Sequence, residues 1–308
     1  MKIVVPEKIS ARGIEAFRAA GFEVKQLTPD SAHSGELVRE LADADALVVR
    51  SAVKVTADVI AAAPRLRVIG RAGVGVDNVD VAAAAARKIV VMNTPGGSSV
   101  AVAELVLAMM LALARQLPRA DATTRAGQWE KKSLEGAELA GKTLGLIGCG
   151  RIAAEVAKRA RAFDMRVIGY DPVVSPGIET VPLEQLLAES DYLSLHAALT
   201  PQTHNLLNDA AFAKMKPGVR IVNCARGEMV DEAALARALQ SGRVSGAALD
   251  VFRKEPPGAS PLFSLPNVIA TPHLGASTRE AQERVGSAIA EQIRDFLLHG
   301  TVANAVSA

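Results

Sequence analysis

Arg226, Glu255 and His273 are the residues whose types could act together on a small organic acid. Arg226 follows an apolar run and precedes a glycine, and His273 follows a second apolar run. A guanidinium in such a position binds a carboxylate through two parallel hydrogen bonds. A histidine changes charge near neutral pH, so it donates a proton to a ketone or accepts one from an alcohol. The set therefore predicts proton transfer beside a carboxylate, which is the protein's share of hydride transfer to a nicotinamide.

Glu255 lies in a proline-rich loop, between Arg226 and His273 in the sequence. A carboxylate placed against an imidazole orients the ring and stabilises its charged form. Taken alone, a glutamate in such a loop is more often a surface residue, and Arg226 by itself also fits a solvated surface. The residue types leave both readings of these two side chains open.

A glycine-rich turn between an apolar strand and a helix is the clearest candidate for dinucleotide binding. Gly148 and Gly150 match the first two glycines of G-x-G-x-x-G/A, and Ala153 takes the third position. The first glycine permits a tight turn. The second lets the backbone approach a pyrophosphate, which then sits on the N-terminus of the following helix.

Asp171 closes the next predicted strand, at the place where an acidic residue is expected about 20 residues after such a turn. A carboxylate there accepts hydrogen bonds from the ribose hydroxyls of NAD and repels the extra phosphate of NADP. Strand, turn, helix and acidic residue together predict an NAD site. The alternative is an ordinary strand-to-helix turn followed by a capping aspartate.

Strand and helix patterns alternate along the chain, as in parallel sheets covered by helices. Strands are predicted at Ile3–Pro6, Glu23–Leu27, Ala46–Arg50, Arg67–Gly70 and Ile89–Asn93. A second series comprises Leu144–Ile147, Arg166–Tyr170, Tyr192–His196, Arg220–Cys224, Ala247–Val251 and Val268–Ala270. Long helices are expected near Ser99–Gln116 and Thr278–Leu298, and Gly127–Lys132 reads as an exposed connection. The predicted fold class is α/β, with two doubly wound parallel sheets.

Composition and charge exclude several function classes. The chain has 308 residues, 49% of them hydrophobic, and a formal net charge of +2, so it lacks the basic field that nucleic acid or anionic lipid requires. The apolar stretch Val100–Ala114 is too short to span a bilayer. Cys149 and Cys224 have no metal-type spacing, so we expect no metal and a reducing, cytoplasmic setting. The first residues read as a strand, and we expect no signal peptide.

Several further segments, together with these residues, resemble the D-isomer specific 2-hydroxyacid dehydrogenase family. The segments that carry the resemblance are Val49–Ser51, Gly70–Asp80, Met92–Pro95, Cys224–Gly227, Ala247–Phe252, Glu255–Pro257 and Pro272–Thr278, beside the turn at Gly148–Ala153 with Asp171. The resemblance covers essentially the whole chain. It implies a Rossmann NAD-binding domain inserted in a flavodoxin-like substrate domain, with boundaries at 1–95 plus 283–308 for the substrate domain and 96–282 for the NAD-binding domain.

The resemblance also assigns site residues. It makes His273 the proton carrier, Glu255 its partner and Arg226 the residue that holds the substrate carboxylate and carbonyl. The cofactor-binding residues expected are Gly148, Gly150, Arg151, Ile152, Asp171, Pro172, His196, Cys224, Ala225, Arg226, Asp250, His273, Gly275 and Ala276.

The substrate site implied by the resemblance lies mainly in the first third of the chain. The backbone of Gly73, Val74, Gly75 and Val76 is expected to bind the substrate carboxylate. Arg50 and Arg71 are candidates for a substrate phosphate, and Lys131 is expected to add charge from a neighbouring subunit of a homodimer or homotetramer.

Within the family, the segments are most similar to the members that oxidise 3-phospho-D-glycerate to 3-phosphohydroxypyruvate with NAD, the entry to serine synthesis. The first alternative is a glyoxylate or hydroxypyruvate reductase of the same chemistry. The second is a binding protein that senses NAD, as in the corepressor branch of the superfamily. Longer relatives carry C-terminal regulatory domains, so this short form is expected to lack serine feedback of that kind.

Some positions depart from the family's pattern. Val74 stands where a hydroxyl residue is frequent, Ser98 replaces an Asn, Ala101 a Ser, Ala153 the third Gly and Ala198 a Pro. These changes bear on cofactor affinity and substrate preference, and they leave Arg226, Glu255 and His273 unchanged.

Overall fold

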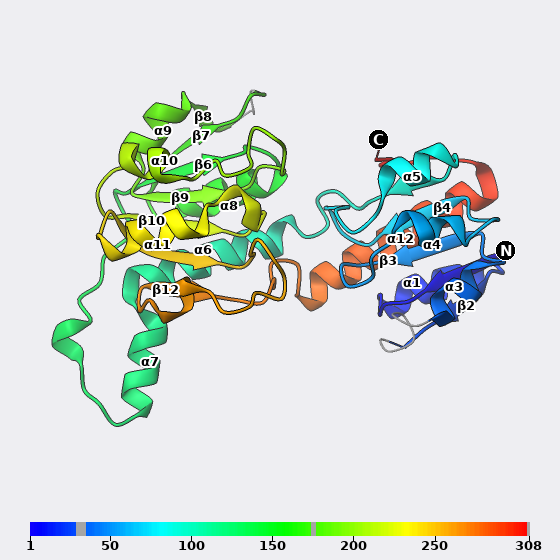
Figure 1. The fold of residues 1–308 in the computed structure, drawn as a ribbon, viewed down its shortest axis with the longest axis horizontal. Coiled ribbons are helices and arrows are strands. Elements are labelled where there is room, and N and C mark those ends of the chain that lie inside the picture. The colour runs from blue at the N-terminus through cyan, green and yellow to red at the C-terminus, as the bar shows by residue number, and fades with distance from the viewer. Residues whose placement is uncertain (29–34, 174–176, 307–308) are drawn as a thin grey trace. The chain divides into compact units, whose positions relative to one another are not determined.

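The computed structural model describes residues 1–28, 35–173 and 177–306 (Figure 1). The chain forms two compact units, one made of Met1–Ser98 and Ala276–Ala308, the other of Ser99–Gly275. Each unit is a parallel sheet with helices on both faces, as the alternation of strand and helix patterns predicts.

The first unit contains a five-stranded sheet in the order β2-β1-β3-β4-β5, the flavodoxin-like order. Its strands are β1 (Lys2–Val5), β2 (Glu23–Gln26), β3 (Ala46–Val49), β4 (Val68–Arg71) and β5 (Val90–Met92). Its helices are α1 (Ala11–Ala19), α3 (Gly35–Leu41), α4 (Ala57–Ala61), α5 (Val81–Ala86) and α12 (Arg279–His299). Successive strand residues point to opposite faces, so Leu47 packs under α3 and α4 whereas Val48 packs under α1 and α12.

Two glycines let α1 and α12 cross closely. A Cβ on Gly13 would lie 2.7 Å from the carbonyl oxygen of Gly286, and one on Gly286 would lie 2.8 Å from the backbone nitrogen of Ser10. Ser10 caps α1 through the N–H of Gly13, and Thr278 caps α12 through the N–H of Ala281. The close crossing therefore brings the capped start of α1 against α12.

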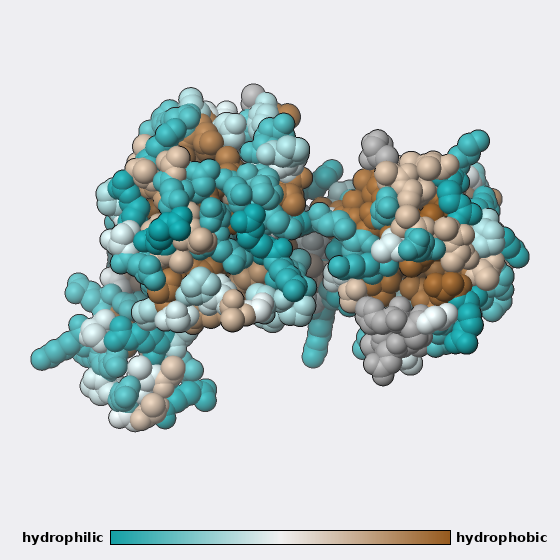
Figure 2. All heavy atoms as spheres, viewed as in Figure 1, coloured by the Kyte–Doolittle hydropathy of each residue, from teal (hydrophilic) through white to brown (hydrophobic). Residues whose placement is uncertain are grey.

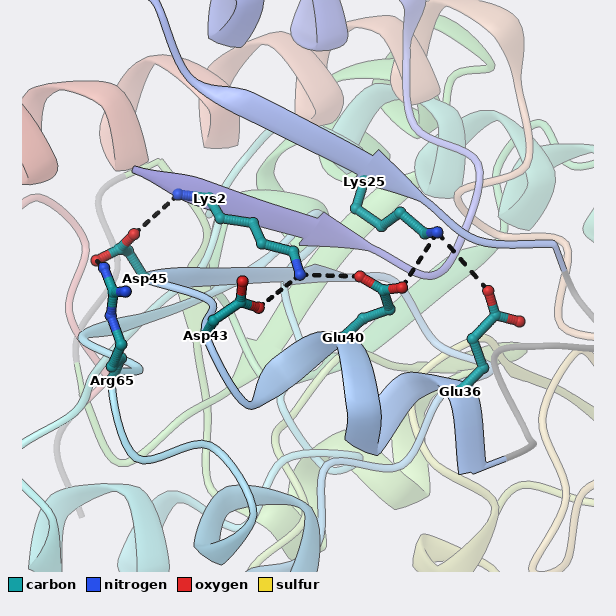
Figure 3. Close-up of polar contacts among 7 residues, drawn as sticks. All are labelled: Lys2, Lys25, Glu36, Glu40, Asp43, Asp45 and Arg65. Carbon is teal, nitrogen blue, oxygen red and sulfur yellow. Dashed lines mark hydrogen bonds and ion pairs between the residues drawn. The ribbon is translucent and has the colours of Figure 1, made fainter.

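A network of ion pairs ties α3 to the β2 edge of this sheet (Figure 3). The Lys2 ammonium contacts Glu40 at 2.8 Å and Asp43 at 2.5 Å, and Lys25 contacts Glu40 at 3.1 Å. Hydrogen bonds from Lys2 and Lys25 lower the pKa of Glu40. Because Glu40 and Asp43 lie at the surface, we read the network as a local clamp on α3 rather than a site.

The second unit contains a seven-stranded parallel sheet in the order β12-β11-β10-β9-β6-β7-β8. Its strands are β6 (Thr143–Ile147), β7 (Arg166–Tyr170), β8 (Glu179–Thr180), β9 (Tyr192–Leu195), β10 (Val219–Asn223), β11 (Val244–Leu249) and β12 (Val268–Ala270). The buried faces of α6 (Ser99–Arg115) and α8 (Arg151–Ala162) join one core cluster. Those of α9 (Leu183–Glu189), α10 (Asp209–Lys214) and α11 (Glu232–Gln240) join the other. Strand order reverses between β6 and β9, which makes this a Rossmann sheet with one added strand.

An arm leaves the second unit after α6. Gln116 adopts a left-handed conformation (φ 50°), and α7 (Leu117–Arg125) and the short helix η1 (Lys131–Ser133) follow (Figure 1). Figure 2 shows the arm at the lower left, covered mainly by hydrophilic residues. Of its apolar side chains, Trp129 is 82% exposed and Leu117 is 52% exposed.

Sequence and structure differ at a few element boundaries and in two elements. Of the predicted connection Gly127–Lys132, the last two residues belong to η1, and α7 before it lies where no helix was predicted, because α7 buries no residue and so carries no apolar stripe. The two-residue strand β8 was also not predicted. Among the described residues, no single helix is long and apolar enough to cross a bilayer, and only α6 and α7 together, bent by 62°, meet the length and composition for it.

Candidate active site

The turn between β6 and α8 has the geometry that its glycines predicted. Gly148 adopts a left-handed φ of 88°, and a Cβ there would lie 2.5 Å from the backbone nitrogen of Ala197. Gly150 is extended, and among the described residues no heavy atom lies within 4 Å of a Cβ added to it. The first glycine is required by the turn itself, whereas the second leaves open space above the backbone.

The N-terminus of α8 borders this open space. Within the described part of the chain, no side chain caps the helix, so the first-turn N–H groups at Arg151 and Ile152 have no capping partner. Ala153 is fully buried, as expected for the position where helix and strand pack closely. Uncapped donors, an open approach and a helix dipole fit a pyrophosphate.

Asp171 directly follows β7, and its carboxylate binds the backbone of the turn between β6 and α8. One carboxylate oxygen accepts the Cys149 N–H at 2.7 Å, and the other accepts the Val173 N–H at 2.9 Å. The sequence did not foresee these contacts. Each oxygen retains a second lone pair, so the carboxylate keeps its capacity for a ribose while its orientation is fixed. Pro172, beside it, is exposed.

His196 follows β9 at the point where strand order reverses. Its backbone N–H donates to the Ile147 carbonyl at 2.7 Å, and its Nε2 is buried with no hydrogen-bond partner in the described residues. Burial lowers the pKa of His196 to about 4, so the ring is neutral at pH 7. A buried polar atom without a partner in this crevice fits a site that a ligand completes.

His196 gives the second unit a specific pH dependence. Its folded pKa of about 4 lies below the ordinary value of about 6.5, so between these pH values the unfolded chain binds a proton that the folded chain does not. Stability contributed by the neutral ring is therefore lost as pH falls from about 6.5 towards about 4, at up to about 1 kcal/mol per pH unit.

When the pH is lowered from 7 to 5, we expect the thermal midpoint of the His196→Gln variant to fall less than that of the wild type. The matched control is His204→Gln, because His204 is exposed. Equal losses in the wild type and in both variants would show that His196 titrates normally in the folded protein.

Arg226 stands at the end of a turn that Asn223 organises. The Asn223 amide donates to the Arg226 carbonyl at 2.9 Å, and its side-chain oxygen accepts the Ala225 N–H at 3.0 Å. Gly227 then approaches the next loop so closely that a Cβ would lie 2.0 Å from the carbonyl carbon of Phe252. The residue Asn223, 1% exposed, was not singled out from the sequence, and its role depends on contacts that only the folded turn creates.

Glu255 and His273 are in direct contact. The residue types alone had left open whether Glu255 is a surface residue or a partner of the imidazole. Glu255 Oε2 lies 2.7 Å from His273 Nδ1, and its Oε1 accepts the Phe252 N–H at 3.1 Å. The His273 side chain is 49% exposed and that of Glu255 37% exposed. The carboxylate is anchored on one oxygen and orients the imidazole with the other, so His273 keeps Nε2 for a ligand.

Asp250 fixes the loop that carries His273. Its side-chain oxygens accept the Thr271 hydroxyl at 2.6 Å and the Leu274 and Gly275 N–H groups at 2.6 and 2.8 Å. The Asp250 carbonyl also accepts the N–H of His273, which has a left-handed φ of 55°. Asp250, predicted as a cofactor residue, thus shapes the loop of His273 through hydrogen bonds to Thr271, Leu274 and Gly275.

The remaining predicted cofactor residues lie along the same strand ends. Cys224 donates to the Met109 sulfur at 3.6 Å, and burial raises the pKa of its thiol, so the thiol is neutral. Ala225 is buried, and Ala276 begins the segment that returns to the first unit. Among the described residues, no three His, Cys, Asp or Glu side chains are grouped to hold a metal ion.

The predicted substrate residues other than Lys131 lie in the first unit, at the carboxyl ends of β3 and β4. Arg50 follows β3, and its Nη1 donates to the Lys8 carbonyl at 3.2 Å. Arg71 ends β4 and folds over Gly73, where its Nη1 occupies the position of a Cβ. Among the described residues, no acceptor is bound by the backbone N–H groups of Val74, Gly75 and Val76, which fits a carboxylate-binding loop.

Lys131 lies on η1 in the arm, where it is exposed. The arm's own ion pair joins Arg119 and Glu130 at 2.5 Å. The structure therefore places Lys131 on the exposed arm of the second unit, and its role beside a neighbouring subunit stays a prediction.

Comparison with known proteins gives the family to which the chain is similar. Residues 107–275 match the model of the D-isomer specific 2-hydroxyacid dehydrogenase, NAD binding domain. The chain is 53% identical over 279 residues to the D-3-phosphoglycerate dehydrogenase of Rattus norvegicus, covering 89% of this chain and 52% of that protein. It thus spans about half the length of the relatives of that name from mammals.

Two solved structures have the same fold over their whole length. The TT0316 protein from Thermus thermophilus superposes with a TM-score of 0.91 at 39% identity, covering 99% of this chain and 100% of that one. A glyoxylate reductase from Paecilomyes thermophila gives a TM-score of 0.89 at 32% identity, covering 99% and 98%.

Proposed function

The chain belongs to the D-isomer specific 2-hydroxyacid dehydrogenase family, and on that premise we propose that it oxidises 3-phospho-D-glycerate to 3-phosphohydroxypyruvate with NAD. This is the D-3-phosphoglycerate dehydrogenase reaction, the first step of serine biosynthesis. The observation that carries the chemistry is the 2.7 Å contact between His273 and Glu255 in the unit that holds the dinucleotide turn. The substrate is supported by the 53% identity to relatives of that name.

In the proposed mechanism, His273 moves the proton. Nδ1 is held by Glu255, so Nε2 accepts the proton of the substrate hydroxyl as the alcohol becomes a ketone. Bound NAD would supply the acceptor for the hydride that leaves the hydroxyl-bearing carbon. Arg226 binds the substrate carboxylate and the carbonyl oxygen, and the turn built by Asn223 holds it there.

The residues proposed to hold NAD are those around the two glycines of the β6–α8 turn. The pyrophosphate would lie over Gly150 and the first turn of α8, and the ribose hydroxyls would donate to Asp171. His196 would supply its buried Nε2 to the bound dinucleotide. The other members of the proposed set are Arg151, Ile152, Pro172, Cys224 to Arg226, Asp250, His273, Gly275 and Ala276.

Asp171→Ala is expected to weaken NAD binding by roughly 10-fold or more and to leave NADP binding nearly unchanged, because charged hydrogen bonds to ribose hydroxyls are lost. Dissociation constants for both dinucleotides would measure this. Asp171→Asn is the control, because it keeps an oxygen for the Cys149 N–H while removing the charge. A cofactor ratio unchanged in both variants would place the ribose elsewhere.

The substrate site is proposed in the unit of Met1–Ser98 with Ala276–Ala308. The backbone N–H groups of Val74, Gly75 and Val76 would bind the carboxylate, and Arg50 and Arg71 supply positive charge at neighbouring strand ends. This division assigns the cofactor to one unit and most substrate contacts to the other. The compact units change at Ser98–Ser99 and at Gly275–Ala276, a few residues from the boundaries near 95 and 283 that the resemblance implies.

The first alternative is a glyoxylate or hydroxypyruvate reductase, favoured by the fold match to a glyoxylate reductase. That match has 32% identity, against 53% for the phosphoglycerate dehydrogenase of rat. A binding protein that senses NAD is the second alternative. Rates of NADH oxidation with three keto acids distinguish all three, since a sensor gives no turnover with any of them.

We also propose that the chain forms a homodimer or homotetramer and works in the cytoplasm. The exposed Trp129 and Leu117 on the projecting arm favour a self-association surface, and Lys131 would reach a neighbouring site from there. The two free cysteines fit a reducing compartment. Light scattering of the purified chain tests the association, and a monomeric mass would reject it.

A further inference from the structure

A cavity of about 450 Å³ opens in the first unit where strand order reverses between β1 and β3. It is lined by the loop after β1, by Arg50 directly after β3 and by the start of α12. In open α/β sheets, ligands bind in this crevice, beyond the carboxyl ends of the strands at the reversal point. The position alone therefore marks the cavity as a ligand site.

The charge of the lining selects an anion. Lys8, Arg50 and Arg279 contribute three cations, and Glu283 is the acidic residue among the lining side chains. Glu283 accepts a hydrogen bond from the Ser287 hydroxyl at 3.2 Å, one turn further along α12. The lining therefore carries a net excess of positive charge.

A second cavity of about 430 Å³ in the same unit gives a useful contrast. Its charged lining pairs Arg12 and Arg284 with Glu283 and Glu291, so the charges balance. Arg284 there also donates to the Gly97 carbonyl at 2.9 Å. The excess of cations is thus a property of the β1–β3 crevice and not of the surface around α12 in general.

The backbone N–H groups of Arg50 and Ala52 already have an acceptor. The Glu7 carboxylate accepts the N–H groups of Arg50 at 2.7 Å and Ala52 at 2.9 Å. An anion in the crevice would consequently be bound by side chains. Arg50 is preset for this, since Glu7 holds its backbone and the Lys8 carbonyl accepts its Nη1.

The cations are carried by elements that cannot move apart freely. Lys8 precedes α1, and Arg279 is the first residue of α12. The close crossing at Gly13 and Gly286 packs the start of α1 against α12, about two turns after Arg279. The positive ends of both helix dipoles add to the attraction for an anion.

We propose that Lys8 and Arg279 bind the phosphate of the substrate together with Arg50 and thereby set the preference for a phosphorylated 2-hydroxy acid. This inference rests on the proposed function, and it adds two specificity-determining residues to that site. Arg71 is not part of this lining, because its guanidinium folds over Gly73.

The test compares kcat/KM for 3-phosphohydroxypyruvate with kcat/KM for hydroxypyruvate in the full chain with NADH. Lys8→Ala and Arg279→Ala should each lower the ratio of the two values by about 10-fold or more, the effect of one lost charged hydrogen bond. Arg18→Ala is the matched control, because it removes an exposed cation from the far end of α1. Its ratio should stay within about 2-fold of the wild type.

Suppose that the wild type prefers the phosphorylated acid while Lys8→Ala and Arg279→Ala both keep the wild-type ratio of the two kcat/KM values. That result would overturn the inference and leave the proposed function intact. If the wild type instead prefers hydroxypyruvate, the proposed function fails, and titration with inorganic phosphate decides the anion site. If the double variant Lys8→Ala/Arg279→Ala binds inorganic phosphate more weakly than the wild type by about 10-fold or more, the result supports the crevice as an anion site. Absent or unchanged binding would overturn it.

Discussion

Replacing His273 by alanine is expected to lower kcat by about 100-fold to 10,000-fold, the usual contribution of a general acid or base. The dissociation constant of NADH should change by less than about 3-fold, because the dinucleotide turn is built around Gly148 and Gly150 after the central strand β6, whereas His273 follows the edge strand β12. Stopped-flow turnover and fluorescence titration with NADH measure the two quantities separately.

Two further variants make this result specific. His204→Ala removes an exposed histidine whose Nε2 contacts Arg253 at 3.3 Å, and it should leave kcat within about 2-fold of the wild type. Glu255→Gln keeps a side chain of the same size against His273 and should lower kcat less than His273→Ala does. A His273 variant that loses NADH binding and turnover together would refute the proton-carrier role.

Gly150→Ala is expected to abolish most dinucleotide binding without destabilising the protein. The backbone at Gly150 is extended and, among the described residues, no atom lies within 4 Å of the added Cβ, so an alanine is accommodated there. The new methyl group occupies the space through which a pyrophosphate approaches the backbone. The dissociation constant of NADH should rise by roughly 10-fold or more, with a thermal midpoint within about 2 °C of the wild type.

Gly148→Ala is the matched substitution, and it is expected to lower the stability of the protein, which Gly150→Ala leaves unchanged. A left-handed φ of 88° and backbone atoms of Ala197 at 2.5 Å mean that an alanine strains the turn. We expect a loss of about 1–3 kcal/mol in stability, seen as a lower thermal midpoint. If Gly150→Ala instead lowered the midpoint as much and spared NADH, the pyrophosphate would not lie over this turn.

The fold class could be predicted because strands and helices have different patterns of apolar residues, and both patterns are clear in the sequence. Fully buried strands such as β3 read as continuous apolar runs, and each is followed by a helix with one apolar face. Strand ends were less predictable, by up to three residues, because the hydrogen-bonded pairing that defines a strand end does not follow the hydrophobic pattern. The helix α7 buries no side chain, so no pattern marks it.

The residue types of the catalytic set were visible in the sequence, whereas the contacts that position them were not. Glu7 and Asp250 act through hydrogen bonds to backbone groups far along the chain, for example Glu7 to Ala52 and Asp250 to Gly275. Nothing in composition or spacing reveals such bonds, because they depend on which loops the sheet order brings together. The same reason explains why the contact of Asp171 with Cys149 was unforeseen.

The proposed substrate is best checked by NADH oxidation with 3-phosphohydroxypyruvate, hydroxypyruvate and glyoxylate, measured side by side with the purified wild-type chain. We expect kcat/KM for 3-phosphohydroxypyruvate to exceed both other values by about 10-fold or more, since the phosphate adds charged hydrogen bonds. A higher kcat/KM for hydroxypyruvate or glyoxylate would reject 3-phosphohydroxypyruvate as the preferred substrate. The chain would then be a reductase of the same chemistry. No turnover with any of the three, together with clear NADH binding, would contradict the enzyme assignment itself.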